Sequence, residues 1–164
     1  MQLNKVKFAE NQKEDFHKEL RKRVAAYFKE NGISRYANVN MVLKTIFMIS
    51  LYIVPFVLIL AYLESTWLVV VMWALMGFGM AGIGLSVMHD ANHGSYSNNK
   101  TLNNIMAHSM NLIGGTACIW KMQHNVLHHT YTNIKGADED IEAGDLLRFS
   151  PEQPKKKMHR FQHI

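Results

Sequence analysis

The sequence predicts an all-α integral membrane protein: a two-span helical hairpin with interfacial helices and a histidine-rich cytoplasmic lobe. Three observations predict this fold class. Two long uncharged apolar runs follow one another at 45–63 and 67–87. The Lys and Arg residues lie outside these runs. Six of the nine histidines fall between positions 89 and 129, directly after the second run.

The segment 1–44 is expected to be a cytoplasmic and interfacial region. Over 13–31, apolar side chains recur every four residues among basic ones. They are Phe16, Leu20, Val24 and Phe28. This spacing predicts an amphipathic helix that ends at Asn31 and Gly32. We expect the helix to lie on the membrane surface rather than to pack on the protein. The polar first 20 residues predict no cleavable signal peptide.

Each apolar run is long enough to span a membrane. As helices rising ~1.5 Å per residue, 45–63 and 67–87 would extend ~28 and ~31 Å, close to the ~30 Å hydrocarbon core of a bilayer. Pro55 would bend the first helix without forbidding it. Only residues 64–66 separate the runs. So short a link forces a tight antiparallel hairpin, 45–87.

The distribution of charge sets the expected orientation. Ten Lys and Arg residues precede the first run, none lies in the turn, and eight follow the second run. The positive-inside rule therefore places both ends of this multi-pass chain in the cytoplasm. Attraction to anionic lipid headgroups explains the basic residues, and no nucleic-acid-binding motif accompanies them, so we expect no nucleic-acid partner. The alternative, a hairpin buried inside a soluble protein, would require protein contacts on every face of both helices, and we therefore favour the membrane.

Residues 88–164 form the predicted cytoplasmic region, which contains two histidine clusters. His89 and His93 form the first cluster, and His124, His128 and His129 form the second. Helical residues four apart share a face, and His129 adds a third ligand about 100° around the axis. The apolar stretch 105–120 is too short and too polar to span. We expect it at the membrane interface or against the hairpin.

This set of side chains predicts a redox-active metal site. Neutral imidazole binds first-row transition metals well, and five imidazoles exceed the need of one zinc with an open position. They indicate two metals, or one metal with ligands from elsewhere. Cys118 is the single cysteine, and the zinc-peptidase pattern His-Glu-x-x-His is missing. A site near lipid tails faces unactivated C–H bonds, for which iron is the usual metal.

HDANHGS at 89–95, WKMQHNVLHHTYTN at 120–133 and GADEDI at 136–141 resemble the first two histidine boxes, and the segment after them, of membrane fatty-acid desaturases. The resemblance is to the acyl-lipid and acyl-CoA branch that includes the front-end enzymes. In that family the boxes ligate two irons, and O2 with two electrons removes two hydrogens from an acyl chain. The resemblance implies a lipid membrane, a fatty-acyl substrate and an electron-transfer protein as partners. The iron ligands it implies are His89, His93, His124, His128 and His129.

The chain departs from the family pattern in two ways. The third box, roughly Gln-x-x-His-His or His-x-x-His-His after a second pair of spans, has no match, since Gln162-His163 lacks the second histidine. We therefore expect an N-terminal fragment that is inactive in isolation. Residues 1–44 contain no His-Pro-Gly-Gly motif of a fused haem carrier. Electrons are accordingly expected from a separate ferredoxin or cytochrome.

Polar side chains beside the histidines allow two interpretations. Asp90, Asn92 and Asn125 either orient imidazole N–H groups or cap helices and face water. The acidic run is expected to be a solvated loop, the alternative being that it tunes the site or binds the electron donor. It comprises Asp138, Glu139, Asp140 and Glu142.

The remaining histidines and two tryptophans are expected to have structural roles. His108 is predicted to be a hydrogen-bonded structural residue rather than a sixth ligand. The expected surface histidines are His17, His159 and His163, and the expected aromatic anchors at the membrane boundary are Trp67 and Trp120.

Two other functions remain open. A membrane di-iron hydroxylase or alkane monooxygenase uses the same arrangement of boxes, and only the HGS and HHTYTN extensions favour a desaturase. A non-catalytic metal-binding membrane protein is the second alternative. A metal transporter would need ionisable residues within its spans, and the two apolar runs contain none.

Overall fold

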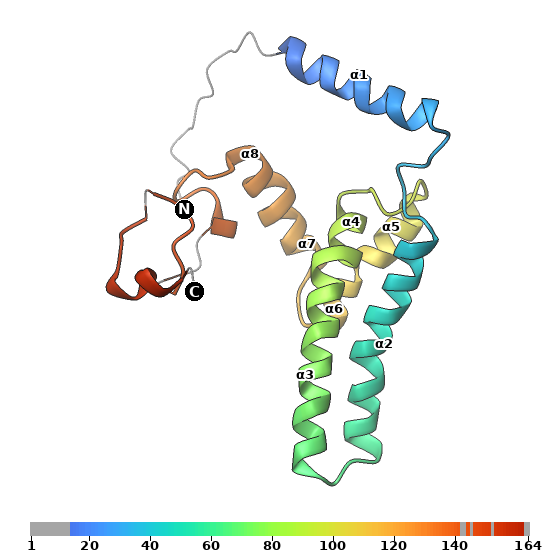
Figure 1. Ribbon diagram of the computed structural model, residues 1–164, viewed down its shortest axis with the longest axis vertical. Coiled ribbons are helices and arrows are strands. Elements are labelled where there is room, and N and C mark those ends of the chain that lie inside the picture. The colour runs from blue at the N-terminus through green and yellow to red at the C-terminus, as the bar shows by residue number, and fades with distance from the viewer. Residues whose placement is uncertain (1–13, 142–143, 145, 152, 163–164) are drawn as a thin grey trace.

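The computed structural model describes residues 14–141, 144, 146–151 and 153–162, and every regular element in them is a helix (Figure 1). The α-helices are α1 (Glu14–Glu30), α2 (Val39–Ala61), α3 (Thr66–Gly82), α4 (His89–Asn92), α5 (Lys100–Ala107), α6 (Ser109–Leu112), α7 (Ala117–Trp120) and α8 (His129–Tyr131). The π-helical segments are η1 (Ile83–Met88) and η2 (Lys121–His128), and the 3-10 turns are η3 (Glu139–Ile141) and η4 (Lys157–Phe161). The all-α prediction is confirmed for these residues.

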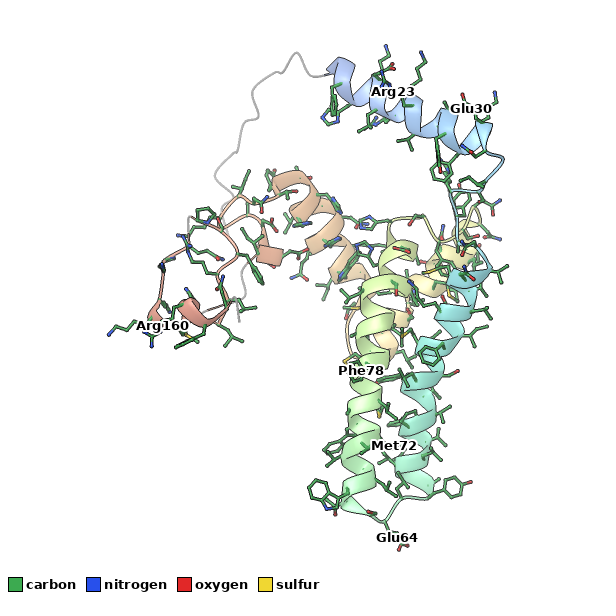
Figure 2. All side chains as sticks on the ribbon, viewed as in Figure 1. Arg23, Glu30, Glu64, Met72, Phe78 and Arg160 are labelled. Carbon is green, nitrogen blue, oxygen red and sulfur yellow. The ribbon has the colours of Figure 1, made fainter. Side chains whose placement is uncertain are left out.

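Helices α2 and α3 form the antiparallel hairpin, with Glu64 at its turn (Figure 2). Helix α2 begins six residues before the predicted run, because the side-chain oxygen of Asn38 accepts a hydrogen bond from the backbone N–H of Met41 at 3.0 Å and caps the helix. Helix α3 continues without a break through η1 and α4, so that Thr66–Asn92 is one rod of 27 residues. Both rods are long and apolar enough to cross a membrane.

The two rods approach closely at Gly79. A Cβ atom there would lie 2.8 Å from the backbone nitrogen of Tyr52 and 3.0 Å from the carbonyl oxygen of Met48. The backbones can therefore come this near only because the residue has no side chain. The outer surface of the hairpin is apolar and uncovered: Trp73 is 63% and Phe78 70% exposed. Such a continuous apolar surface requires lipid or other protein around it.

A small buried core lies at the end of the hairpin opposite the turn. Ile83 and Val87 on η1 are fully buried, and the short helices α5 and α6 pack against this end. A hydrogen bond joins the segment after α4 to α2, since the Tyr96 hydroxyl donates to Thr45 Oγ1 at 2.9 Å. Within the predicted apolar stretch 105–120, α5 and α6 contact the hairpin at η1, while Ile105, Leu112 and Ile119 are exposed.

Helix α1 confirms the predicted amphipathic segment. It ends at Glu30, directly before Asn31 and Gly32, and Gly32 has a φ of 60° that suits glycine. The helix lies crosswise to the hairpin and apart from the other helices (Figure 1). Its apolar side chains are uncovered, with Phe16 63% and Val24 48% exposed.

One predicted surface histidine is buried. His159 is only 6% exposed, and its Nδ1 accepts a hydrogen bond from the backbone N–H of Lys156 at 3.1 Å. The surface prediction for His159 is wrong because the turn η4 folds the side chain back onto its own backbone. His17 is exposed as predicted, and His163 lies outside the described residues.

Candidate metal centre

The first histidine cluster stands at the end of the long α3 rod. The helix continues past the apolar run as predicted, so that His89 begins α4 and His93 caps it, with the backbone N–H of His93 bonded to the His89 carbonyl at 3.1 Å. Gly94 follows with a φ of 70°, which turns the chain away. Immediately before His89 the helix passes through the π-helical segment η1.

The second cluster lies on η2 and α8, reached through the short helix α7. His124 and His128 are within the π-helical segment, and His129 begins α8. The predicted spacing assumed α-helix, whereas both clusters adjoin or occupy π-helical turns. Such turns are rare and frequently occur at functional sites.

The two clusters converge on one place. Each imidazole ring has its centroid 4.6–5.3 Å from those of at least two others. His124 is central: it lies 5.3 Å from His89 and His93, and 4.9 Å from His128 and His129. Side chains separated by more than 30 positions in the sequence thus form a single group of five rings.

The donor atoms fall into two overlapping groups that could each hold a metal ion. His89, His93 and His124 place one nitrogen each within 4.8 Å of one another. His124, His128 and Asp140 form the second group by the same measure. Imidazoles and carboxylates are donor groups suited to iron.

Two residues of the acidic run contact the second cluster directly. Asp138 is completely buried, and its Oδ1 lies 2.9 Å from Nδ1 of His128. Asp140 Oδ2 lies 2.5 Å from Nδ1 of His124. The expectation of a solvated loop is wrong for Asp138, because the chain folds back after α8 and brings the turn η3 against η2. Asp140 is exposed to solvent as expected, but it also contacts His124. Glu142 lies outside the described residues.

Electrostatics favour a charged Asp138 and a neutral His93. Burial opposes ionisation of the Asp138 carboxyl, but hydrogen bonds from His128 and from the backbone N–H groups of Asn133 and Asp140 outweigh it and hold its pKa below the usual value. Desolvation lowers the pKa of His93, and repulsion from His89 and the second cluster lowers it further. A low histidine pKa keeps the ring neutral and able to bind metal.

The three polar neighbours named from the sequence behave differently. Asp90 Oδ1 lies 3.3 Å from Nδ1 of His89, a long contact. The Asn125 side-chain N–H donates to the backbone carbonyl of Asn92 at 3.1 Å and so ties the two clusters together. The side-chain oxygens of Asn92 and Asn125 are buried and find no hydrogen-bond partner among the described residues. Neither asparagine bonds to an imidazole in the hydrogen bonds found here.

Trp120 is a neighbour that the sequence interpretation missed. Its ring stacks on His124 with a centroid distance of 4.3 Å and an interplanar angle of 24°, and it meets His89 and His93 edge-on at 5.7 and 5.9 Å. Its position four residues before His124 was the available signal. His108, by contrast, is outside the cluster and bonds through Nδ1 to the Asn104 carbonyl at 2.7 Å, as predicted for a structural residue.

Comparison with known proteins agrees with this geometry. The model of the family described as "Fatty acid desaturase" matches residues 65–164, which is more than half of the chain and includes both histidine clusters. This chain belongs to the fatty acid desaturase family. An sn-1 linoleoyl-lipid 6-desaturase from Arthrospira platensis is 36% identical over 90% of this chain and 40% of its own length.

Two further members of the family are similarly related. An acyl-lipid (8-3)-desaturase from Physcomitrium patens is 36% identical over 97% of this chain and 34% of its own length. An sn-1 linoleoyl-lipid 6-desaturase from Synechocystis sp. is 36% identical over 98% of this chain and 44% of its own length. The chain therefore spans less than half the length of these family members. No solved structure gave a significant match.

Proposed function

We propose that the protein containing this chain is a fatty-acyl desaturase, an oxidoreductase of lipid metabolism that inserts a double bond into an acyl chain with O2. One observation carries the proposal: five imidazoles from two separate segments converge at one end of an apolar hairpin. Neutral imidazoles suit iron, and the hairpin brings the site close to lipid acyl chains. Membership of the desaturase family supports the same reaction.

The proposed ligands of two iron ions are His89, His93, His124, His128 and His129. The bound irons would supply the O2 activation that breaking unactivated C–H bonds requires. His124 is central among the five rings, so its imidazole would hold iron together with ligands of both clusters. The chain's own contribution is to hold the five imidazoles close together, to lower the pKa of His93 by desolvation, and to present the rings beside an apolar surface along which an acyl chain could lie.

Neighbouring residues would complete the site in different ways. Asp90 would orient His89 weakly, since their contact is long. Asn92 and Asn125 would fix the distance between the clusters rather than orient imidazoles. The family's third histidine box has no counterpart in residues 1–164, so we propose that the chain alone does not turn over.

The substrate is proposed to be an acyl chain carried by a lipid. The relatives are named as linoleoyl-lipid and acyl-lipid desaturases, and a lipid environment would cover the exposed apolar surface of the hairpin. In the proposed topology α2 and the α3 rod span the membrane, both ends of the chain are cytoplasmic, and Glu64 lies on the outer side. Electrons would come from a separate ferredoxin or cytochrome, and α1 would lie on the membrane surface.

Product analysis of the complete protein tests the function. The protein is produced in a host that lacks the activity, supplied with acyl lipids, and its fatty acids are identified by gas chromatography and mass spectrometry. A new double bond supports the proposal. A hydroxylated chain would instead establish the hydroxylase alternative, and bound iron without any oxidised product would establish the non-catalytic one.

A further inference from the structure

We infer that Asp138 and Asp140 are positioning residues that fix His128 and His124, so that each imidazole turns Nε2 toward the metal. The inference rests on the proposed metal centre and extends it to the acidic run. The key juxtaposition is that two carboxylates, ten and sixteen residues from their partners, each meet an Nδ1 atom of the same histidine cluster.

The Asp138 side chain is held from several directions. Its Oδ2 accepts a hydrogen bond from the backbone N–H of Asn133 at 2.7 Å, and its Oδ1 accepts one from the N–H of Asp140 at 3.1 Å. The same Oδ1 is 2.9 Å from His128 Nδ1. A fully buried carboxylate fixed by two backbone donors cannot rotate freely. It therefore defines the orientation of the His128 ring.

The turn after Asp138 is fixed to η2 by two more contacts. Asp140 Oδ2 is 2.5 Å from His124 Nδ1, while the Gln123 side-chain amide donates to Glu139 Oε2 at 2.9 Å. The turn η3 is thus bonded to two adjacent residues of η2, the proposed ligand His124 and its neighbour Gln123. At His89, the carboxylate contact found among the described residues is the longer one of 3.3 Å with Asp90. Tight orientation by carboxylates is therefore a property of the second cluster.

Hydrogen-bond chemistry determines the tautomer. An ionised carboxylate can only accept, so the Nδ1 atoms of His124 and His128 must carry the proton. The lone pair then resides on Nε2, on the opposite side of each ring, where it is free to bind metal. A carboxylate partner of this kind also raises the basicity of the ligand and commonly changes metal affinity by about 10–100-fold.

The same geometry argues against Asp140 as a ligand itself. Its oxygen is close enough to the donor atoms of His124 and His128 to join a metal-binding group. However, its Oδ2 lies 2.5 Å from Nδ1 of His124 and 3.8 Å from Nδ1 of His128. A metal bound at Nε2 of either ring would lie on the far side from the carboxylate. Asp140 therefore acts through His124.

Iron affinity of the complete, purified protein tests this inference. Asp138→Asn and Asp140→Asn should each weaken iron binding by about 10–100-fold in competition with a chelator. Glu139→Gln is the matched control, since it removes the same charge from the same turn but contacts Gln123 instead of an imidazole. It should leave the affinity within about twofold. Equal losses in all three variants would show a general charge effect and overturn the inference.

A double-mutant cycle separates positioning from general structure. In a His128→Ala background, Asp138→Asn should cause no further loss of iron affinity, whereas in a His124→Ala background it should still weaken binding. The same further loss in both backgrounds would overturn the assignment of Asp138 to His128. If Asp138→Asn prevents folding, Asp140→Asn carries the test, because its side chain is 35% exposed.

Two other outcomes are distinguishable. Loss of one iron per protein in Asp140→Asn, without a change in the affinity of the other, would make Asp140 a ligand and overturn its positioning role. Failure of the unaltered protein to bind iron would refute the proposed function itself. Normal iron binding with unaffected Asp138→Asn and Asp140→Asn variants would refute only this inference.

Discussion

The α2–α3 hairpin and the histidine region that follows it are held together by different interactions. In the hairpin, backbones approach each other at Gly79, and most of the outer surface is apolar and uncovered. In the histidine region, specific polar pairs make the connections, such as His128 with Asp138 and Asn125 with Asn92. The stability of the hairpin therefore depends on the size and hydrophobicity of its side chains. The structure of the histidine region depends instead on the chemical identity of single side chains.

The largest effect that this comparison predicts is at His128. In the complete protein, His128→Ala should reduce iron loading and oxidation by more than about 100-fold, exceeding the effect of losing a carboxylate partner, while membrane insertion stays intact. Iron content and product formation provide the measurement. His108→Ala is the control and should retain both, because His108 bonds only to its own helix. Unchanged turnover in His128→Ala would remove it from the ligand set.

A smaller effect is expected where the two rods meet. Gly79→Ala should destabilise the hairpin by about 1–3 kcal/mol, because the added methyl group meets backbone atoms of α2 that cannot move independently. Denaturant titration in detergent micelles measures this. Gly77→Ala, with no atom within 4 Å of the added carbon, should be neutral or slightly stabilising. Equal stability of the two variants would contradict the close approach.

The hydrogen bond between Tyr96 and Thr45, which joins the histidine region to the hairpin, should contribute less to folded stability than the close packing at Gly79. Tyr96→Phe removes the hydroxyl that donates to Thr45 and should cost about 0.5–1.5 kcal/mol, a typical value for one hydrogen bond. Tyr36→Phe is the control, since the Tyr36 hydroxyl accepts a hydrogen bond from the neighbouring Arg35 and makes no bond to α2 among the described residues. The same denaturant titration applies. A loss in both variants of equal size would indicate that the Tyr96 contact is not specific.

The smallest expected effect is the change of folded stability with pH. The pKa of His93 in the folded, metal-free protein lies below its usual value of 6.5, so the unfolded chain binds a proton there first as the pH falls. Folded stability should therefore be constant above about pH 6.5 and decrease below it. Thermal unfolding of the metal-free protein across this range checks the sign, and His93→Gln should flatten the dependence. A rise in stability toward lower pH would contradict the lowered pKa.

The hairpin could be predicted from the sequence because its signals are local. Length and hydrophobicity define the spans, and the four-residue spacing defines α1 and the position of His89 and His93 on one face. The start of α2 was missed because the cap at Asn38 lies outside the apolar run. Family resemblance supplied the five candidate ligands, and their convergence agrees with it.

The partners of the histidines could not be predicted in the same way. Asp138 and Asp140 look like part of a charged, solvated run, and only the folding of the turn η3 against η2 brings them to His128 and His124. His159 was misjudged for a related reason, since a local turn buries a polar residue in a basic segment. A hydrogen bond between side chains leaves no periodic pattern in a sequence.

The uninterrupted rod Thr66–Asn92 links the hairpin turn rigidly to the first histidine cluster. Inserting or deleting one residue within it would rotate His89 and His93 by about 100° and shift them by ~1.5 Å along the axis. Both rings would then face away from His124. The loop between the rods can change in length without this penalty. The number of residues in the second rod therefore sets both the height of His89 and His93 along the rod axis and the direction in which their side chains point.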